Sequence, residues 1–307
     1  MTRPEPMLLV QTNTLLIAGL TSLLWGLTGI FVRLLPALPP LTVTAGRLLV
    51  ALLVILPILG LVRSARQQFA SILAHPIAYT LALLLTGYYL LATTAFQLAP
   101  VAEVALLLST PPLFVLSFRR IRHDIPSRTE VSGALLAVLG ICLILAPALA
   151  STGESSINHL IGNILAVCAA GLTAIYAYTY RLLHERGTAP ETIGVSLLTF
   201  VSGSAVLVLM VIFSPTPAML ETLTGKDLLI FLGIGVFSTA IPSLGFAIAS
   251  SHLPAVVTAT TSLLIPLFAG LFAFLILGET LSPMFIPGGF LVLAGIAMII
   301  HHGTNKS

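Results

Sequence analysis

Ten apolar stretches, each long enough to cross a bilayer, occupy nearly all of this 307-residue chain. A membrane-spanning helix needs about 20 mainly apolar residues, and only 7% of the chain is Asp, Glu, Lys or Arg. The stretches are continuously apolar rather than alternating, which indicates helices and not the strands of a barrel. We therefore predict an all-α integral membrane protein with ten transmembrane helices.

Short connections, such as residues 98–100 and 251–255, join the predicted spans, so sequential neighbours are expected to be antiparallel. The spans cover residues 12–35, 41–62, 74–96, 101–118, 131–149, 160–181, 192–213, 228–250, 256–277 and 284–301.

Positive charge falls mainly on alternate connections, and this asymmetry orients the predicted helices. With a cytoplasmic N-terminus, the inner connections and tails hold ten Lys or Arg residues, whereas the outer connections hold Arg33 and Lys226. Cytoplasmic loops of membrane proteins carry the excess of positive charge. We expect a multi-pass protein of the bacterial inner membrane with both termini in the cytoplasm. The net charge of +3 reflects this asymmetry, and the chain lacks the basic face that nucleic acid requires.

An internal repeat divides the chain into two halves. Shifting residues 98–141 by 155 positions onto 253–296 superposes Pro111 on Pro266, Ser127 on Ser282, Gly133 on Gly288 and Gly140 on Gly295. A shorter match aligns Gly-Leu-Thr at residues 26–28 with the same three residues at 171–173. We predict a first five-helix repeat over residues 1–150 and a second over 151–307. Because five is odd, the second repeat is expected to insert upside down.

Inverted repeats are typical of alternating-access transporters, whose substrate sites lie between the two halves near the bilayer midplane. The competing interpretation is that the duplication only built a stable helix bundle. Inverted repeats also occur in some channels.

Short motifs follow one another along the chain. They are Trp25-Gly26, Arg47, Leu-Ala-Pro-Val-Ala-Glu at 98–103 leading to Pro111, Leu-Gly-Glu-Thr-Leu at 277–281, and Gly288 with Gly295. Together with the ten spans they resemble the EamA family of the drug/metabolite transporter (DMT) superfamily. Ala102-Glu103-Val104, between a tyrosine-bearing third span and a proline-broken fourth, is similar to the YddG branch of aromatic and neutral amino-acid exporters. One departure is His123-Asp124, which stands where the family has Gly-Glu after the fourth span.

Glu103 is the one carboxylate inside a predicted span, and Arg47 is the arginine that lies deepest within one. Glu103 lies about one turn into the fourth span, where a carboxylate costs several kcal/mol unless it is paired or meets water. The alternative is that the amides and dipole of the helix N-terminus hold it. Arg47 lies roughly 9 Å into the second span at 1.5 Å per residue. Since both spans start at the outer face, we expect Arg47 to pair with Glu103 at the outer mouth, or else to extend toward the lipid headgroups.

Aromatic and hydroxyl side chains inside the spans are the candidate substrate contacts. Aromatic residues near mid-span lie too deep to serve as interfacial anchors. The hydroxyl groups come just before prolines, and a proline leaves a backbone carbonyl of the preceding turn without its helical hydrogen bond, so that it can bind a polar substrate. Packing between helices is the alternative role of both groups. The predicted substrate-binding residues are Trp25, Thr28, Tyr88, Glu103, Tyr176, Ser243, Thr258 and Ser262. The predicted gate and hinge residues are Arg47, Pro111, Pro242 and Pro266.

Missing motifs narrow the function further. The chain has no His-Glu-x-x-His, no Gly-x-Ser-x-Gly and no ATP-binding motif, so we expect no catalysis, metal site or cofactor. The ninth span has no Lys or Arg to meet a phosphate. We expect a monomeric secondary transporter that exports neutral or hydrophobic amino acids. Export of drugs or organic cations held by Glu103 is the alternative. A channel-like pore is a second alternative, although one carboxylate does not supply a ring of charges.

Overall fold

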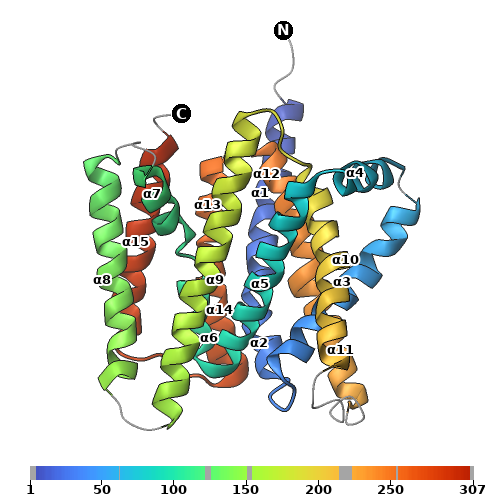
Figure 1. Ribbon diagram of the computed structural model, residues 1–307. Helices are drawn as coiled ribbons and strands as arrows, with labels where there is room; N and C mark the ends of the chain where they lie inside the picture. Colours follow the sequence, from blue (N-terminus) through green and yellow to red (C-terminus); the bar gives the residue numbers. More distant parts are fainter. Residues whose placement is uncertain are drawn as a thin grey trace.

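The computed structural model describes residues 5–61, 63–121, 126–150, 154–213, 223–253 and 255–304. Within these ranges the secondary structure is helical, without strands, and the helices form one bundle (Figure 1). Both termini emerge at the same end of the bundle, here named the termini end, and the opposite end is named the far end. The prediction of an all-α membrane fold is confirmed.

The first half contains α1 (Glu5–Gly26), α2 (Thr28–Arg33), α3 (Pro40–Leu61), α4 (Arg63–Leu73), α5 (Pro76–Leu98), α6 (Val101–Leu107), α7 (Pro111–Ile121) and α8 (Arg128–Ala150). The second half contains α9 (Glu154–Glu185), α10 (Thr192–Ile212), α11 (Gly225–Gly235), the π-helical η2 (Val236–Ala240), α12 (Ile241–His252), α13 (Ala255–Ser262), α14 (Leu264–Phe272), the π-helical η3 (Ala273–Leu277) and α15 (Phe285–Thr304). Among the described residues nine stretches are long and apolar enough to span a membrane, and Phe285–His301 is a shorter apolar helix.

Two predicted spans are interrupted next to a proline. α6 ends at Leu107 and α7 begins at Pro111, and α13 ends at Ser262 while Pro266 lies in the first turn of α14. Proline lacks the amide hydrogen and clashes with the preceding turn, so it is favoured at a helix start and disturbs a helix interior. The helix breaks expected near Pro111 and Pro266 are present, and the role of these prolines as hinges stays a prediction.

Two further irregularities occur in the bundle. α1 ends at Gly26 and α2 begins at Thr28, without a proline between them. The π-helical η2 precedes α12, whose second residue is Pro242. Short π-helical segments occur frequently at functional sites, because they displace the helix hydrogen-bond pattern by one residue.

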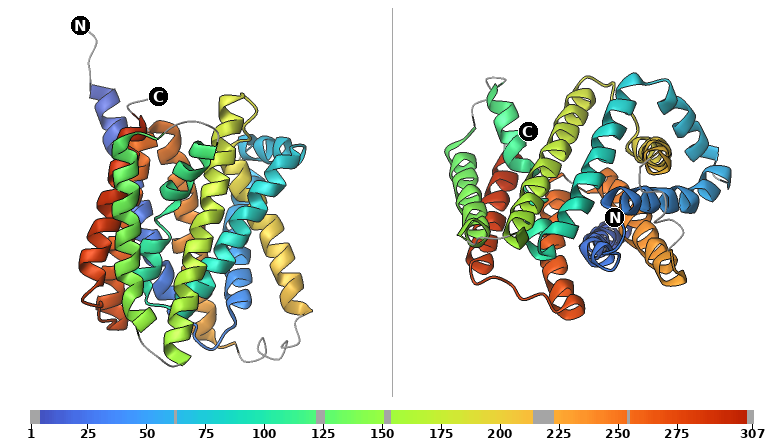
Figure 2. Two further views of the ribbon diagram at one scale, coloured as in Figure 1. Left: turned by 60° about the vertical axis from the view of Figure 1, so that its left-hand side comes forward. Right: turned by 60° about the horizontal axis from the view of Figure 1, so that its bottom comes forward.

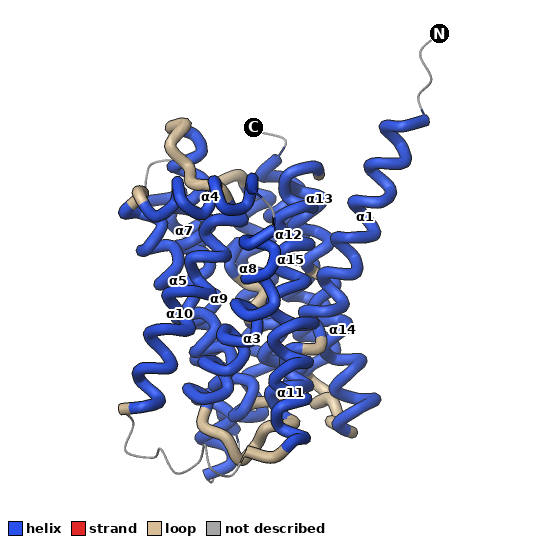
Figure 3. Tube along the Cα trace, turned by 90° about the vertical axis from the view of Figure 1, so that its right-hand side faces the viewer, coloured by secondary structure: helices blue, strands red, loops and turns tan. Residues whose placement is uncertain are grey.

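α4 was expected to be a connection, and it is a helix that lies across the termini end (Figure 1, Figure 3). Its apolar side contains Ile72, which is 1% exposed and packs in a cluster with Leu81 of α5 and Leu198 of α10. Its polar side contains the exposed Arg66. This separation of apolar and polar sides is what keeps the helix at the surface of the bundle.

α8 and α15 pack side by side along one flank (Figure 1, Figure 2). A Cβ atom on Gly133 would lie 2.6 Å from the carbonyl oxygen of Gly295, and one on Gly140 would lie 2.5 Å from that of Gly288. Only glycine permits backbones to approach this closely. The contacts are reciprocal, since the repeat aligns Gly133 with Gly288 and Gly140 with Gly295.

Candidate functional site

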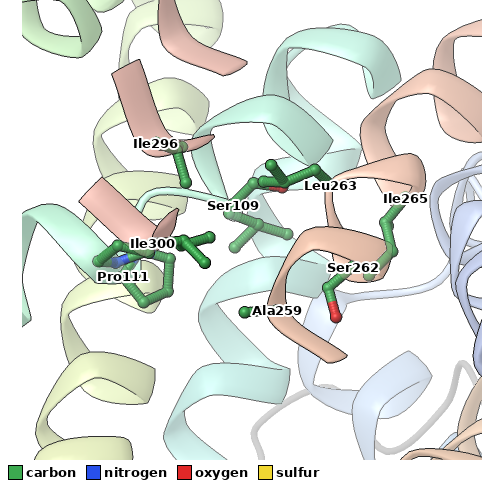
Figure 4. A pocket seen from close by; sticks show the side chains of 10 residues that line it. Ser109, Pro111, Ala259, Ser262, Leu263, Ile265, Ile296 and Ile300 are labelled. Carbon is green, nitrogen blue, oxygen red and sulfur yellow. The ribbon is translucent and has the colours of Figure 1, made fainter. Parts of the chain in front are cut away.

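A small pocket lies beside both proline-associated helix breaks (Figure 4). Its volume is ≈ 190 Å³, below the roughly 300–1,000 Å³ of sites for drug-sized ligands. The residues that line it come from α7, α13, α14, α15 and the connections before α7 and α14: Leu108, Ser109, Pro111, Pro112, Ala259, Ser262, Leu263, Ile265, Ile296 and Ile300. Leu108 and Leu263 are counterparts in the repeat. The pocket therefore forms where the broken helices of the two halves meet.

The pocket wall is apolar except for two hydroxyl groups. Ser109 Oγ donates to the carbonyl oxygen of Ala105, and Ser262 Oγ donates to that of Thr258, each over 3.0 Å. Because each hydroxyl hydrogen is donated to the carbonyl oxygen four residues earlier, the oxygen lone pairs remain to accept a hydrogen bond from a ligand. The described residues that line the pocket include no acidic or basic side chain. Such a wall suits a small molecule with an apolar body and a donor group.

Two predicted residues, Ser262 and Pro111, line this pocket, and the buried Thr258 precedes Ser262 by one helical turn. The predicted aromatic contacts lie elsewhere and pack against other rings. The ring of Trp25 is 5.4 Å from that of Phe246, Tyr88 is 5.3 Å from Tyr89, and Tyr176 is 6.0 Å from Tyr180. Thr28 is buried at the start of α2, Ser243 is half-buried on α12, and Pro242 and Pro266 are buried. Their roles in substrate binding or hinge motion stay predictions.

Glu103 lies at the far end, in the first turn of α6, and is 4% exposed. Nε2 of His159 is 2.6 Å from Oε2 of Glu103, and Nδ2 of Asn163 donates to the same oxygen over 3.0 Å. His159 and Asn163 lie one turn apart on α9, which belongs to the other half. These three residues are named the Glu103 junction. A buried carboxylate is thus held by two polar side chains across the halves, which is the compensation that a membrane interior demands.

A second carboxylate joins the halves at the same end. Glu279, which follows η3, accepts a hydrogen bond from the amide of Val101 at the start of α6 over 2.9 Å. Its other oxygen is 3.5 Å from Nε of Arg33. Arg33 also donates to the carbonyl oxygens of Gln97 and Ala99, over 3.3 and 2.9 Å. The connection between α5 and α6 is therefore held from both halves, two residues before Glu103.

Arg47 does not pair with Glu103, so that prediction is wrong. The side chain is 2% exposed and does not extend toward headgroups. Its Nε donates to Thr239 Oγ1 over 3.1 Å, its Nη2 donates to the carbonyl oxygen of Ser238 over 3.2 Å, and its guanidinium carbon lies 4.8 Å above the ring of Tyr89. Equal depth along two helices says nothing about the direction in which each side chain points. α3 turns Arg47 toward η2 and α5, whereas α6 turns Glu103 toward α9.

The partners of Glu103 were missed in the sequence. The sixth span was predicted to begin at residue 160, which placed His159 outside the membrane and left Asn163 without a role. α9 begins earlier, at Glu154. A spacing of four residues puts His159 and Asn163 on one helix face, and this was the signal available in the sequence.

Comparisons with known proteins agree with this architecture. The model of the EamA-like transporter family matches residues 12–146 and again 160–301. An uncharacterized transporter of Clostridium kluyveri is 25% identical over 207 residues, which is 67% of this chain and 64% of that protein. The chain thus matches less than two thirds of that relative's length. One solved crystal structure superposes with a TM-score of 0.61 at 18% identity, over 96% of this chain and 99% of the solved chain, and shows the same fold.

The two matches to the family model cover most of the chain, one in each half. The protein belongs to the EamA-like transporter family.

Proposed function

We propose that this chain is a secondary transporter that exports small neutral amino acids by alternating access between its two halves. The observation that carries the proposal is the pocket between the broken helices, with its apolar wall and two acceptor hydroxyls. A small apolar side chain fits such a wall, and the ammonium group of an amino acid donates to the serine oxygens. A phosphate or dicarboxylate would lose its hydration there without compensation.

The inverted arrangement of the halves is part of the proposal. It is supported by the reciprocal glycine contacts of α8 and α15, and by the match of one family model to each half. In Figure 1, α1 starts at the termini end and α9 starts at the far end. The charge asymmetry supports a cytoplasmic termini end in a bacterial inner membrane. In this orientation the Glu103 junction and the Arg33–Glu279 contact close the outer end.

Export of organic cations is the less well supported alternative. It requires a free carboxylate at the binding pocket, whereas Glu103 is not among the residues that line it. The carboxylate is already engaged by His159 and Asn163 at the far end. The small volume of the pocket also favours a ligand of amino-acid size over a drug-sized one. The protein is proposed to act as a monomer, because each half supplies one wall of the pocket.

Uptake of labelled solutes into liposomes containing the purified protein tests this function. We expect transport of Leu, Met, Thr and Phe, and initial rates at least tenfold lower for Glu, Asp and a sugar phosphate. The matched variant Ser262→Ala removes one acceptor and should raise KM for Leu about tenfold or more, since a hydrogen bond to a charged group contributes about 1.5–3 kcal/mol. Equal rates for Leu and Glu would contradict the proposal, as would transport of an organic cation without transport of amino acids.

A further inference from the structure

We propose that the surface helix α4 is a binding site for the headgroups of anionic phospholipids at the termini end. The ligand is a lipid whose phosphate headgroup has a net negative charge, such as phosphatidylglycerol. None of the residues that line the pocket between the broken helices belongs to α4. The site is therefore separate from that pocket and does not depend on which solute the pocket takes.

The exposed side of α4 is basic. Arg63, Arg66 and Gln67 are exposed, and spacings of three and four residues bring side chains together on one face of a helix. Among the described residues neither arginine makes an ion pair. A guanidinium group can donate two parallel hydrogen bonds to one phosphate. The two arginines can thus hold a single phosphate from two sides.

The sequence around α4 has no acidic residue to balance this charge. Between Glu5 and Glu103 the chain contains no Asp or Glu. At the termini end, Glu185 is already paired with Arg181. The basic side of α4 is therefore complementary to an anionic membrane surface, where each nearby Lys or Arg strengthens binding by about fivefold.

The surroundings of α4 indicate that the phosphate belongs to a lipid. The opposite side of the helix packs on the bundle through the buried Ile72. Leu61, Leu73 and Tyr79 border the helix and are exposed, and the hydroxyl group of Tyr79 donates to the carbonyl oxygen of Leu73 over 3.3 Å. Tyrosine is typical of the membrane interface, and an amphipathic helix lies in that interface with its apolar side toward the acyl chains. The chains of a bound lipid would cover these exposed leucines.

The position of α4 connects this site to both halves of the bundle. α4 lies between α3 and α5 in the first half (Figure 1), and Ile72 packs in a cluster with Val195 and Leu198 of α10 in the second half. A headgroup that holds α4 in place therefore also stabilises this contact between the halves. A ligand of the folded state raises the temperature of unfolding, so phosphatidylglycerol should do so more than phosphatidylcholine.

Fluorescence quenching by brominated lipids tests the site without any solute. Trp25, the only tryptophan of the chain, is replaced by Phe, and Leu73→Trp then places a reporter beside the basic side of α4. Phe290→Trp is the reference, because Phe290 is exposed on α15 and residues 227–305 contain no Lys or Arg. Each protein is placed in phosphatidylcholine vesicles with increasing fractions of brominated phosphatidylglycerol or brominated phosphatidylcholine. The ratio of the two binding constants is the preference for the anionic lipid.

At low salt we expect a preference of about tenfold or more at Leu73→Trp, and of less than about twofold at Phe290→Trp. Arg63→Gln and Arg66→Gln should each lower the preference at Leu73→Trp several-fold, and together they should remove it. The double variant should also lose the extra thermal stabilisation by phosphatidylglycerol in detergent. Arg186→Gln removes an exposed arginine at the same end of the bundle and should keep at least half of the preference.

A preference at Leu73→Trp no greater than that at Phe290→Trp would overturn the site, and so would an unchanged preference in the double arginine variant. Equal losses in Arg186→Gln and in the double variant would show that the charge of the whole termini end attracts the lipid, and α4 would then not be the site. Millimolar glycerol phosphate, which has no acyl chains, should not displace the lipid. Displacement would assign the arginines to a soluble phosphate and overturn the lipid assignment.

Discussion

The Glu103 junction and its counterpart at the termini end are built from different chemistry. The 155-residue shift aligns Glu103 with Thr258, and the 145-residue shift of the Gly-Leu-Thr match aligns His159 with Thr14. Thr14 and Thr258 are buried in α1 and α13, which pack against each other. One end thus has a carboxylate and an imidazole where the other has two hydroxyls. Of these two junctions, only the one at the far end contains acidic and basic side chains.

The packing of the two junctions differs as well. A Cβ atom on Gly162 would lie 2.7 Å from that of Ala99, so α9 approaches the α5–α6 connection very closely. The counterpart of Gly162 is Ile17 of α1, whose large side chain prevents an equal approach. The far end is therefore closed by tight and directional contacts. Opening it is expected to be a discrete event, because hydrogen bonds in a packed interface are either made or broken.

The largest effect is expected from placing a carboxylate at the termini end. Thr258→Glu would bury a charge without a partner and should lower the free energy of unfolding by about 3–5 kcal/mol, with loss of amino-acid transport. Thermal unfolding in detergent and liposome uptake measure the two effects.

Adding Thr14→His to Thr258→Glu sharpens the comparison. If the repeat-related residues face each other as Glu103 and His159 do, the imidazole should restore at least half of the lost stability. Thr14→His alone serves as the control. A double variant no more stable than Thr258→Glu would break the proposed equivalence of the two junctions.

A smaller effect is expected from Gly162→Ala. The added methyl group would collide with Ala99, and overpacking of this kind costs about 1–3 kcal/mol. We expect the far end to open more often, so a cysteine at the buried Ala102, which lies against Gly270 of α14, should react several-fold faster with a membrane-impermeant maleimide. Gly19→Ala is the matched control, since a Cβ there has no neighbour within 4 Å. Equal labelling of the two variants would mean that the close approach of α9 does not hold the outer end shut.

The smallest effect is expected from Glu279→Gln. Its ion pair with Arg33 is partly exposed, 32% for Arg33 and 20% for Glu279, so screening by solvent limits its contribution to about 1 kcal/mol or less. The glutamine oxygen still accepts from the amide of Val101. We expect outer labelling to rise about twofold at low salt and to lose its dependence on ionic strength. A rise as large as that expected for Gly162→Ala would show that the Arg33–Glu279 contact holds the far end shut as firmly as the close approach of α9 does.

Hydropathy predicted the fold because backbone polar groups in lipid must be hydrogen-bonded within the protein, which a continuously apolar segment achieves only as a helix. The apolar stretches, the prolines and the distribution of charge can each be read from short segments of the sequence. The helices and the breaks beside Pro111 and Pro266 are present in the structure, whereas the orientation in the membrane stays a prediction. The surface helix α4 was missed because its pattern is amphipathic and short, and the break at Leu27 was missed because no proline marks it.

The candidate site was harder to predict, because contacts between halves depend on rotation about helix axes. The sequence of a helix that is apolar on all sides does not show which side faces a neighbouring helix. Arg47 and Glu103 lie, as predicted, in stretches long and apolar enough to span a membrane, but their partners, Thr239 and His159, were not foreseen. Ser262 and Pro111 were predicted correctly as neighbours of a helix break, since both proline and the adjacent hydroxyl are visible in the chain.

The glycine contacts between α8 and α15 have a consequence for how such a chain can arise. Gly133 meets Gly295 while Gly140 meets Gly288, so exchanging the two halves maps the surface onto itself. A surface of this kind is self-complementary, as in a two-fold homodimer. A chain of half the length that kept both glycines would already possess the surface needed to pair with an inverted copy of itself. Joining two such copies end to end then leaves each free to diverge, so that the first copy carries the acid, Glu103, and the second carries the imidazole, His159.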